Sequence, residues 1–287
     1  MPSDAPGATE LNRVPPDERR PNVIAVHGFI QTLVSWRHLV PRLAALGKRT
    51  CAFDLKGHGG SPAPADDKYS LEDHAAPILA FIRDNDLRDL TLIGHSFGGS
   101  VALLLAVRLA RENRLRALVI IDSFVDASAL RIRLLRVLGL AGAPLAALAF
   151  RWEPLARFAV KLGLWMLCRH PERFEEAAVA AYAANLSRQD HANALIATGK
   201  LMVDDEYAEL RANFSTIEVP TLIVWGAQDR MLSSANADRL HAAIPRSELF
   251  RVEDCGHIPH EERPEIVVEQ IADFLTKHAP AASTKRD

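Results

Sequence analysis

The segment LTLIGHSFGGSVALLLA, residues 90–106, decides the fold of this chain. Its unbroken apolar start predicts a buried strand over Leu90–Ile93, and its apolar end predicts a helix over Ser100–Arg111. Between them lies a Gly-x-Ser-x-Gly pattern centred on Ser96. A serine on a tight strand-to-helix turn has a strained backbone, and glycines on both sides avoid collisions with the neighbouring strand and helix. The segment therefore predicts a serine nucleophile at the end of a strand.

Similar apolar runs, each followed by a turn and a longer helical pattern, recur on both sides of this segment. They do not alternate apolar with polar residues, which is typical of strands buried on both faces. Strands alternating with helices predict the α/β fold class, with a mostly parallel sheet and helices on both of its faces. The predicted strands are Asn22–Val26, Arg49–Phe53, Leu90–Ile93, Ala117–Ile121, Thr221–Trp225 and Leu249–Val252. The predicted helices are Trp36–Leu46, Leu71–Asn85, Ser100–Arg111 and Pro264–Lys277.

One interval interrupts this alternation, because about a hundred residues separate the strand that ends at Ile121 from the one that begins at Thr221. The interval is rich in leucine and alanine, and prolines divide it into several helices. Ligands of open α/β sheets bind outside the carboxyl ends of the strands, so we expect this inserted helical cap to cover a site there. The predicted organisation is a flexible arm at 1–21, an α/β core at 22–123 and 206–277, a helical cap (lid) at 124–205 and a flexible tail at 278–287.

Two further residues complete a candidate catalytic triad with Ser96. A serine hydroxyl is a weak nucleophile until a base takes its proton, and the base needs a carboxylate to orient it. His257 lies just beyond the last predicted strand, and Asp229 lies just beyond the preceding one. All three side chains therefore leave the carboxyl ends of parallel strands at one edge of one sheet. Asp122, directly after the strand that ends at Ile121, is the competing candidate for the acid.

The same edge of the sheet offers candidates for an oxyanion hole and for a substrate pocket. Two backbone N–H groups are the natural donors to an oxyanion, and we expect them to come from Phe97, which follows the nucleophile, and from Phe29, which follows a glycine after the first strand. His27 is expected to support that loop structurally. The predicted substrate-binding residues are Gly28, His95, Phe124, Met231 and Ile258.

Several motifs in a fixed order make the chain similar to a known family. They are His27-Gly28 with Trp36, the segment Asp54–Ser61, the turn at Ser96, the Asp229 loop, and Gly256-His257-Ile258-Pro259 with Glu262, Pro264 and Glu265. With them the chain resembles the α/β-hydrolase superfamily, specifically an esterase- or lipase-like serine member with a helical cap. The resemblance implies that Asp54 and His58 order a loop and are not part of the triad. Members usually begin with an antiparallel hairpin, but the segment before Asn22 is polar and proline-rich, so we expect a sheet of mainly six parallel strands.

A serine nucleophile implies an acyl-enzyme formed from an ester, thioester, lactone or amide, and this chemistry needs no metal and no organic cofactor. The apolar cap favours a small, largely apolar substrate. Carbon–carbon bond hydrolysis and perhydrolysis on the same triad are alternatives. Hydroxynitrile cleavage is a third, which needs a positive charge at the cap floor from Lys161 or Lys200, the only lysines of the cap. A small-ligand receptor of the same fold is an alternative from a different functional class.

The overall composition excludes other classes of partner. Of the 287 residues, 34 are Lys or Arg and 36 are Asp or Glu, so the formal net charge of −2 provides no basic surface for nucleic acid. The longest uncharged stretch, Val137–Phe150, has 14 residues and is too short to span a bilayer. The three cysteines form no C-x-x-C pair, and residues 1–21 lack the apolar core of a signal peptide. We therefore expect a cytoplasmic monomer or homodimer that binds a small molecule.

Overall fold

The computed structural model describes residues 20–123, 125, 148–201 and 206–279. A six-stranded sheet with the order β2-β1-β3-β4-β5-β6 forms its centre, and every neighbouring pair of strands is parallel. This confirms the predicted α/β class, and within the described residues the sheet contains no antiparallel hairpin. The strands are β1 Val23–Val26, β2 Thr50–Phe53, β3 Leu90–His95, β4 Leu115–Ile121, β5 Thr221–Gly226 and β6 Ser247–Val252.

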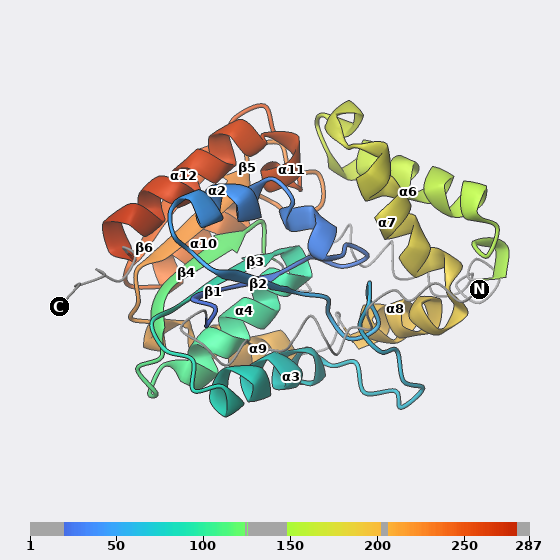
Figure 1. Cartoon of the computed structure of the whole chain (residues 1–287). Coiled ribbons are helices and arrows are strands. Elements are labelled where there is room, and N and C mark those ends of the chain that lie inside the picture. Colours follow the sequence, from blue (N-terminus) through green and yellow to red (C-terminus); the bar gives the residue numbers. More distant parts are fainter. Residues whose placement is uncertain (1–19, 124, 126–147, 202–205, 280–287) are drawn as a thin grey trace.

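Helices cover both faces of the sheet, as predicted (Figure 1). Successive residues of a strand point to opposite faces, so Val23 and Ala25 of β1 pack in one apolar cluster while Ile24 and Val26 pack in another. Helices α2 and α12 contribute to the first cluster, and α3, α4, α9 and α10 contribute to the second. The helices are α2 Leu39–Ala45, α3 Leu71–Asp84, α4 Ser96–Leu109, α9 Glu206–Ala212, α10 Ala235–Ala243 and α12 Pro264–His278, with short turns of helix at η1 Leu33–Trp36, η3 Phe214–Thr216 and α11 Pro259–Glu262.

Two predicted helices differ from the observed ones in ways that follow from local chemistry. In place of the predicted helix over Trp36–Leu46, η1 ends at Trp36 and α2 begins at Leu39, so that Pro41 lies in the first turn of α2, where proline is tolerated. Helix α4 begins at Ser96 itself and not at Ser100, so the nucleophile candidate occupies the first helical position. Helix α3 begins with a capping box in which Ser70 and Asp73 exchange hydrogen bonds with each other's backbone.

The segment between β4 and β5 is helical where it is described, and we call its described part, residues 148–201, the cap. Helices α6 Glu153–Leu167, α7 Glu176–Ser187 and α8 Gln189–Leu201, with a short turn at η2 Pro171–Arg173, lie together beyond one end of the strands (Figure 1). Helices α6 and α7 share an apolar cluster that also includes Ile258 of the core. The predicted cap boundaries at 124 and 205 lie outside the described residues. Among the described helices, none combines the length and the apolar character that crossing a membrane requires.

Candidate active site

The candidate nucleophile lies where β3 turns directly into α4. Ser96 has a φ of +50°, a left-handed conformation that is strained for a residue with a side chain. The turn is tight on both sides. A Cβ atom at Gly94 would lie 2.4 Å from the Gly98 carbonyl oxygen, and one at Gly98 would lie 2.2 Å from the His27 carbonyl oxygen. Glycine is therefore required at both positions, as the sequence predicts.

The structure brings Ser96, His257 and Asp229 together in a hydrogen-bonded chain. Nε2 of His257 lies 3.0 Å from the Ser96 hydroxyl oxygen, and Nδ1 of His257 lies 2.8 Å from Oδ2 of Asp229. When Nδ1–H donates to Asp229, Nε2 can accept the serine proton. Ser96 and His257 are each 3% exposed, so little water competes for these contacts. The arrangement is able to generate a serine alkoxide equivalent and to return the proton to a leaving group.

The Asp229 carboxylate is held by further donors. Its Oδ1 accepts hydrogen bonds from the backbone amides of Met231, at 2.7 Å, and Leu232, at 2.9 Å. Burial alone raises the pKa of Asp229, but His257, a hydrogen bond from Asp122 and the backbone donors outweigh it, so the pKa lies below its usual value. Asp229 is therefore ionised at neutral pH. Of the two acids that the sequence offers, Asp229 is the one that contacts His257.

Asp122 lies behind this carboxylate, at the end of β4. It is fully buried and accepts the backbone amide of Gly226. One potential ligand atom from each of Asp122, Asp229 and His257 lies within 4.8 Å of the other two, a spacing that could hold a metal ion. A cation bound there would compete with the hydrogen bond between His257 and Asp229.

The two predicted oxyanion donors belong to segments that contact each other. The Phe97 amide lies in the first turn of α4, whose positive dipole end favours a developing negative charge. Phe29 follows Gly28, and a Cβ atom at Gly28 would lie 2.7 Å from both Nδ1 of His95 and Oε1 of Gln31. The loop after β1 is thus packed directly against the turn that carries Ser96. Their role as an oxyanion hole stays a prediction.

His95 and Gln31 form a buried layer beneath the site. Nε2 of His95 lies 2.8 Å from the His257 carbonyl oxygen, and Nδ1 lies 2.8 Å from Oε1 of Gln31. The same Gln31 oxygen accepts the Gly28 amide at 2.8 Å. Burial lowers the pKa of His95 to about 3, so its ring is neutral. Because both ring nitrogens contact the protein, a supporting role for His95 is favoured over the predicted contact with substrate. Sequence reasoning missed Gln31.

The other predicted pocket residues have different surroundings. The side chain of Met231 is partly buried against the core cluster, next to the loop that carries Asp229. Ile258 is 5% exposed and packs among the residues of α6 and α7. Phe124 lies outside the described residues. Met231 and Ile258 thus flank the triad on the core side and the cap side respectively.

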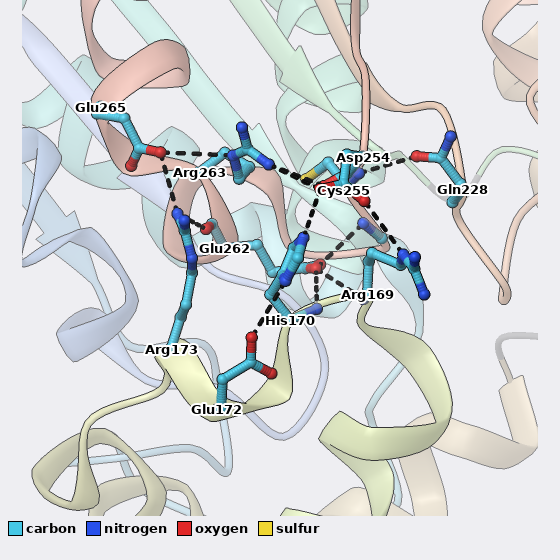
Figure 2. A network of polar contacts seen from close by, with 11 residues as sticks. Arg169, His170, Glu172, Arg173, Gln228, Asp254, Cys255, Glu262, Arg263 and Glu265 are labelled. Atoms are coloured by element: carbon cyan, nitrogen blue, oxygen red, sulfur yellow. Dashed lines mark hydrogen bonds and ion pairs between the residues drawn. The ribbon is translucent and has the colours of Figure 1, made fainter.

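Glu262 joins the cap to the loop of His257. It is fully buried, and its Oε2 accepts the backbone amides of Arg169 at 2.7 Å, His170 at 3.0 Å and Gly256 at 3.1 Å, while Oε1 accepts the amide of Ile258 at 3.2 Å. Figure 2 shows this carboxylate between the two segments. One side chain therefore fixes both neighbours of His257 and the cap segment that covers them.

An ion-pair cluster surrounds Glu262 at the surface (Figure 2). Asp254, in the loop after β6, contacts Arg169 at 3.1 Å, His170 at 2.9 Å and Arg263 at 3.2 Å. The His257 backbone amide also donates to the Leu167 carbonyl oxygen at 3.2 Å. The cap therefore contacts the core through backbone and side-chain groups around the candidate base.

Glu261 is a second buried carboxylate at this junction. It forms an ion pair with Arg37 and accepts hydrogen bonds from Gln31 at 3.0 Å and from the Tyr182 hydroxyl of α7 at 2.7 Å. Burial raises the pKa of Glu261, although Arg37 opposes the shift. The connection runs from the cap through Glu261 and Gln31 to His95.

The residues that the sequence assigns to loop support have that role. His27 is fully buried, and its Nε2 accepts the Leu55 amide at 3.1 Å. Asp54 accepts the amides of Leu33 at 2.8 Å and Gly60 at 2.9 Å. Burial lowers the pKa of His27 to about 4, so this histidine is neutral at neutral pH.

Comparison with known proteins agrees with this architecture. Residues 21–264 match the family model described as the alpha/beta hydrolase fold. The pimeloyl-[acyl-carrier protein] methyl ester esterase of Aromatoleum aromaticum is 30% identical over 261 residues, which cover 89% of this chain and 98% of that protein. The 2-hydroxymuconate semialdehyde hydrolase of a Pseudomonas species is 26% identical over 269 residues, covering 91% and 88%. The structure of the enol-lactonase from Burkholderia xenovorans LB400 has a TM-score of 0.70 at 21% identity, covering 90% of this chain and 92% of that one. The chain therefore belongs to the α/β-hydrolase family.

Proposed function

We propose that this α/β hydrolase cleaves a carboxylic ester, thioester or lactone of a small, largely apolar substrate through an acyl-enzyme. The observation that carries the proposal is the hydrogen-bonded chain from Ser96 through His257 to Asp229, with distances of 3.0 and 2.8 Å. These are hydrogen-bond distances at which a base can take a serine proton without rearrangement. The strained backbone of Ser96, with its φ of +50°, supports the same role.

The reaction begins when the Ser96 oxygen attacks the substrate carbonyl carbon and His257 accepts the hydroxyl proton at Nε2. His257 then protonates the leaving alcohol or thiol, which leaves an acyl group on Ser96. In the second half, His257 activates a water molecule that attacks the acyl carbon, and Ser96 recovers its proton. Asp229 holds the His257 ring in the required tautomer and stabilises its positive charge.

The amides of Phe97 and Phe29 are the proposed donors to the tetrahedral oxyanion. Removing one such donor typically costs about 3 kcal/mol of transition-state stabilisation. Because both donors are backbone groups, their positions depend on the contact between the Gly28 loop and the turn at Ser96. The small residues that permit this contact, Gly28 and Gly98, therefore support the proposal.

Ester and lactone chemistry is favoured by two of the similar proteins, a methyl ester esterase and an enol-lactonase. Carbon–carbon bond hydrolysis is the second candidate, since a relative of comparable coverage is a semialdehyde hydrolase. Hydroxynitrile cleavage is disfavoured, because Lys161 is exposed and paired with Glu176 while Lys200 is exposed on α8. The small-ligand receptor remains an outcome of the test below.

A steady-state assay with chromogenic acyl esters of increasing chain length tests the proposal, with Ser96→Ala as the matched inactive variant. We expect the wild-type protein to turn over at least one ester many times and the variant to lose this activity. Equal rates for both proteins on every ester would contradict ester hydrolysis. Activity on a diketone-type substrate would then favour carbon–carbon hydrolysis, whereas ligand binding without turnover would favour a receptor.

A further inference from the structure

Two acidic side chains lie together at the carboxyl ends of β4 and β5. Asp122 and the side chain of Asp229 are both fully buried. One carboxylate oxygen of Asp122, one of Asp229 and one ring nitrogen of His257 all lie within 4.8 Å of one another. Two carboxylates this close in a buried site disfavour each other's ionisation, because their repulsion adds to the cost of burying charge. We therefore expect one of the two acids to hold a proton.

The hydrogen-bond donors around each acid decide which one is ionised. Asp229 faces Nδ1 of His257 and the amides of Met231 and Leu232, three donors that favour a negative charge. Among the residues that the structure describes, Asp122 has one backbone donor, the Gly226 amide, which lies 3.1 and 3.2 Å from its two oxygens. The negative charge is therefore stabilised on Asp229, and the proton is left on Asp122.

Glu262, from the segment after β6, is a further titratable group that acts on Asp122, and the Cys255 thiol and His257 lie near it as well. Burial, the Asp229 charge and Glu262 raise the pKa of Asp122 well above the usual 3.8, and the Gly226 amide opposes the shift. The backbone of Asp122 is fixed as well, since its amide donates to the Val224 carbonyl oxygen at 3.0 Å.

We propose that Asp122 is a neutral carboxylic acid that donates its proton in a hydrogen bond to Asp229 while accepting the Gly226 amide. It is thus a positioning residue for the chain Ser96–His257–Asp229. This inference rests on the proposed function and adds a residue to the same site. Asp122 keeps its proton throughout the cycle, so His257 remains the only group that exchanges a proton with Ser96 and the leaving group.

Replacement by asparagine tests this assignment, because a carboxamide reproduces a protonated acid. Its NH2 group can donate to Asp229 while its oxygen accepts from Gly226. We expect Asp122→Asn to keep kcat within about threefold of wild type, whereas Asp122→Ala loses about tenfold to a hundredfold, as expected for a lost hydrogen bond to a charge. Asp229→Asn is the comparison variant, with a loss of about a thousandfold or more. Equal large losses for both asparagine variants would show that Asp122 acts as a carboxylate and overturn the proposal.

The pH dependence separates positioning from a purely structural role. An acid whose pKa is raised by folding contributes stability at low pH and loses it as pH rises from about 3.8 through the folded pKa. Wild type should therefore lose stability relative to Asp122→Asn as pH rises, and once Asp122 loses its proton the kcat of wild type should fall while the variant keeps its activity. Identical pH profiles of the two proteins would contradict the proposal.

Infrared spectroscopy at neutral pH detects the protonated carboxylic acid of Asp122 without any substrate. We expect the carbonyl stretch of a protonated carboxylic acid in wild type and in Ser96→Ala, and we expect it to be missing from Asp122→Asn. If Ser96→Ala retains all turnover while this band is present, the proposed function fails and the proton assignment stands. If the band is missing from wild type, the assignment itself is wrong.

Discussion

Ser96 is held by contacts of the residues on either side of it. The chain turns from β3 into α4 within a single residue, and Gly98 then passes so close to β1 that a methyl group at this position would lie 2.2 Å from the His27 carbonyl oxygen. A backbone atom cannot move aside as a flexible side chain can, so any side chain there would displace the turn. The position of Ser96 therefore depends on the absence of a Cβ atom at Gly98.

Substituting Gly98 with alanine tests this dependence. We expect Gly98→Ala to lower the free energy of unfolding by about 1–3 kcal/mol through overpacking, and to reduce kcat by displacing Ser96 and the Phe97 amide. Gly163→Ala is the matched control, because Gly163 is also helical and a Cβ atom there meets nothing within 4 Å. Since both substitutions share the gain in helix propensity, the control should be neutral or more stable by about 1 kcal/mol. Denaturant unfolding compares the two, and equal changes would show that the contact is unimportant.

The proximity of Ser96, Asp229 and His257 could be predicted from the sequence because each follows a recognisable strand. Ser96 comes directly after β3, Asp229 and His257 lie in the loops after β5 and β6, and parallel strands bring their carboxyl ends to one edge. The layer beneath them could not be predicted. Gln31 meets Glu261 across 230 positions of sequence, and no local pattern marks either residue as a partner of the other.

At the scale of elements, the join between cap and core depends on α11, a helix of four residues. Its last residue, Glu262, accepts four backbone amides, two from the turn that follows α6 and two from the residues flanking His257. An uncharged amide accepts less strongly than a carboxylate, and its NH2 group cannot accept at all. The helical character of the segment between β4 and β5 could be predicted from composition, but this attachment could not, because the donors are backbone groups that carry no sequence signal.

Glu262→Gln should loosen both segments at once. We expect the amides of Arg169, His170 and Gly256 to exchange with solvent faster than in wild type, and the free energy of unfolding to fall by about 1–3 kcal/mol, as for buried donors left without a partner. Catalytic efficiency should fall as well, because the His257 loop is less ordered. Hydrogen exchange resolved by residue measures the effect.

Glu265→Gln is the control for this experiment. Glu265 lies three residues further on, is exposed, and pairs with the side chains of Arg173 and Arg263. Surface ion pairs of this kind contribute little to stability. Equal exchange of the three amides in both variants would argue that the cap is held by its apolar contacts and not by Glu262.

At the scale of the whole molecule, several buried histidines are uncharged in the folded protein. Burial lowers the pKa of His27 to about 4 and that of His58, His74 and His95 to about 3, and it lowers the pKa of His260 well below its usual value. Their rings lie close together, with centroids 5.3 Å apart for His27 and His58 and 4.7 Å apart for His95 and His260. Protonating one of them disfavours charge on its neighbours.

This set predicts a steep loss of stability in mild acid. A histidine whose pKa is lowered by folding binds a proton more readily in the unfolded chain, so unfolding takes up protons as pH falls below the usual pKa of 6.5. Each such histidine contributes roughly 1 kcal/mol per pH unit, and five together are enough to offset a stability of about 5–15 kcal/mol within a few pH units. We expect cooperative unfolding as the pH falls from 6.5 toward 4.

Replacing one of these histidines tests the prediction. In His74→Gln the slope of unfolding free energy against pH should be smaller by about one proton. His241→Gln, on the exposed side of α10, is the control for the removal of one histidine. Equal slopes in the two variants, measured by denaturant unfolding at a series of pH values, would mean that His74 is not neutral in the folded protein.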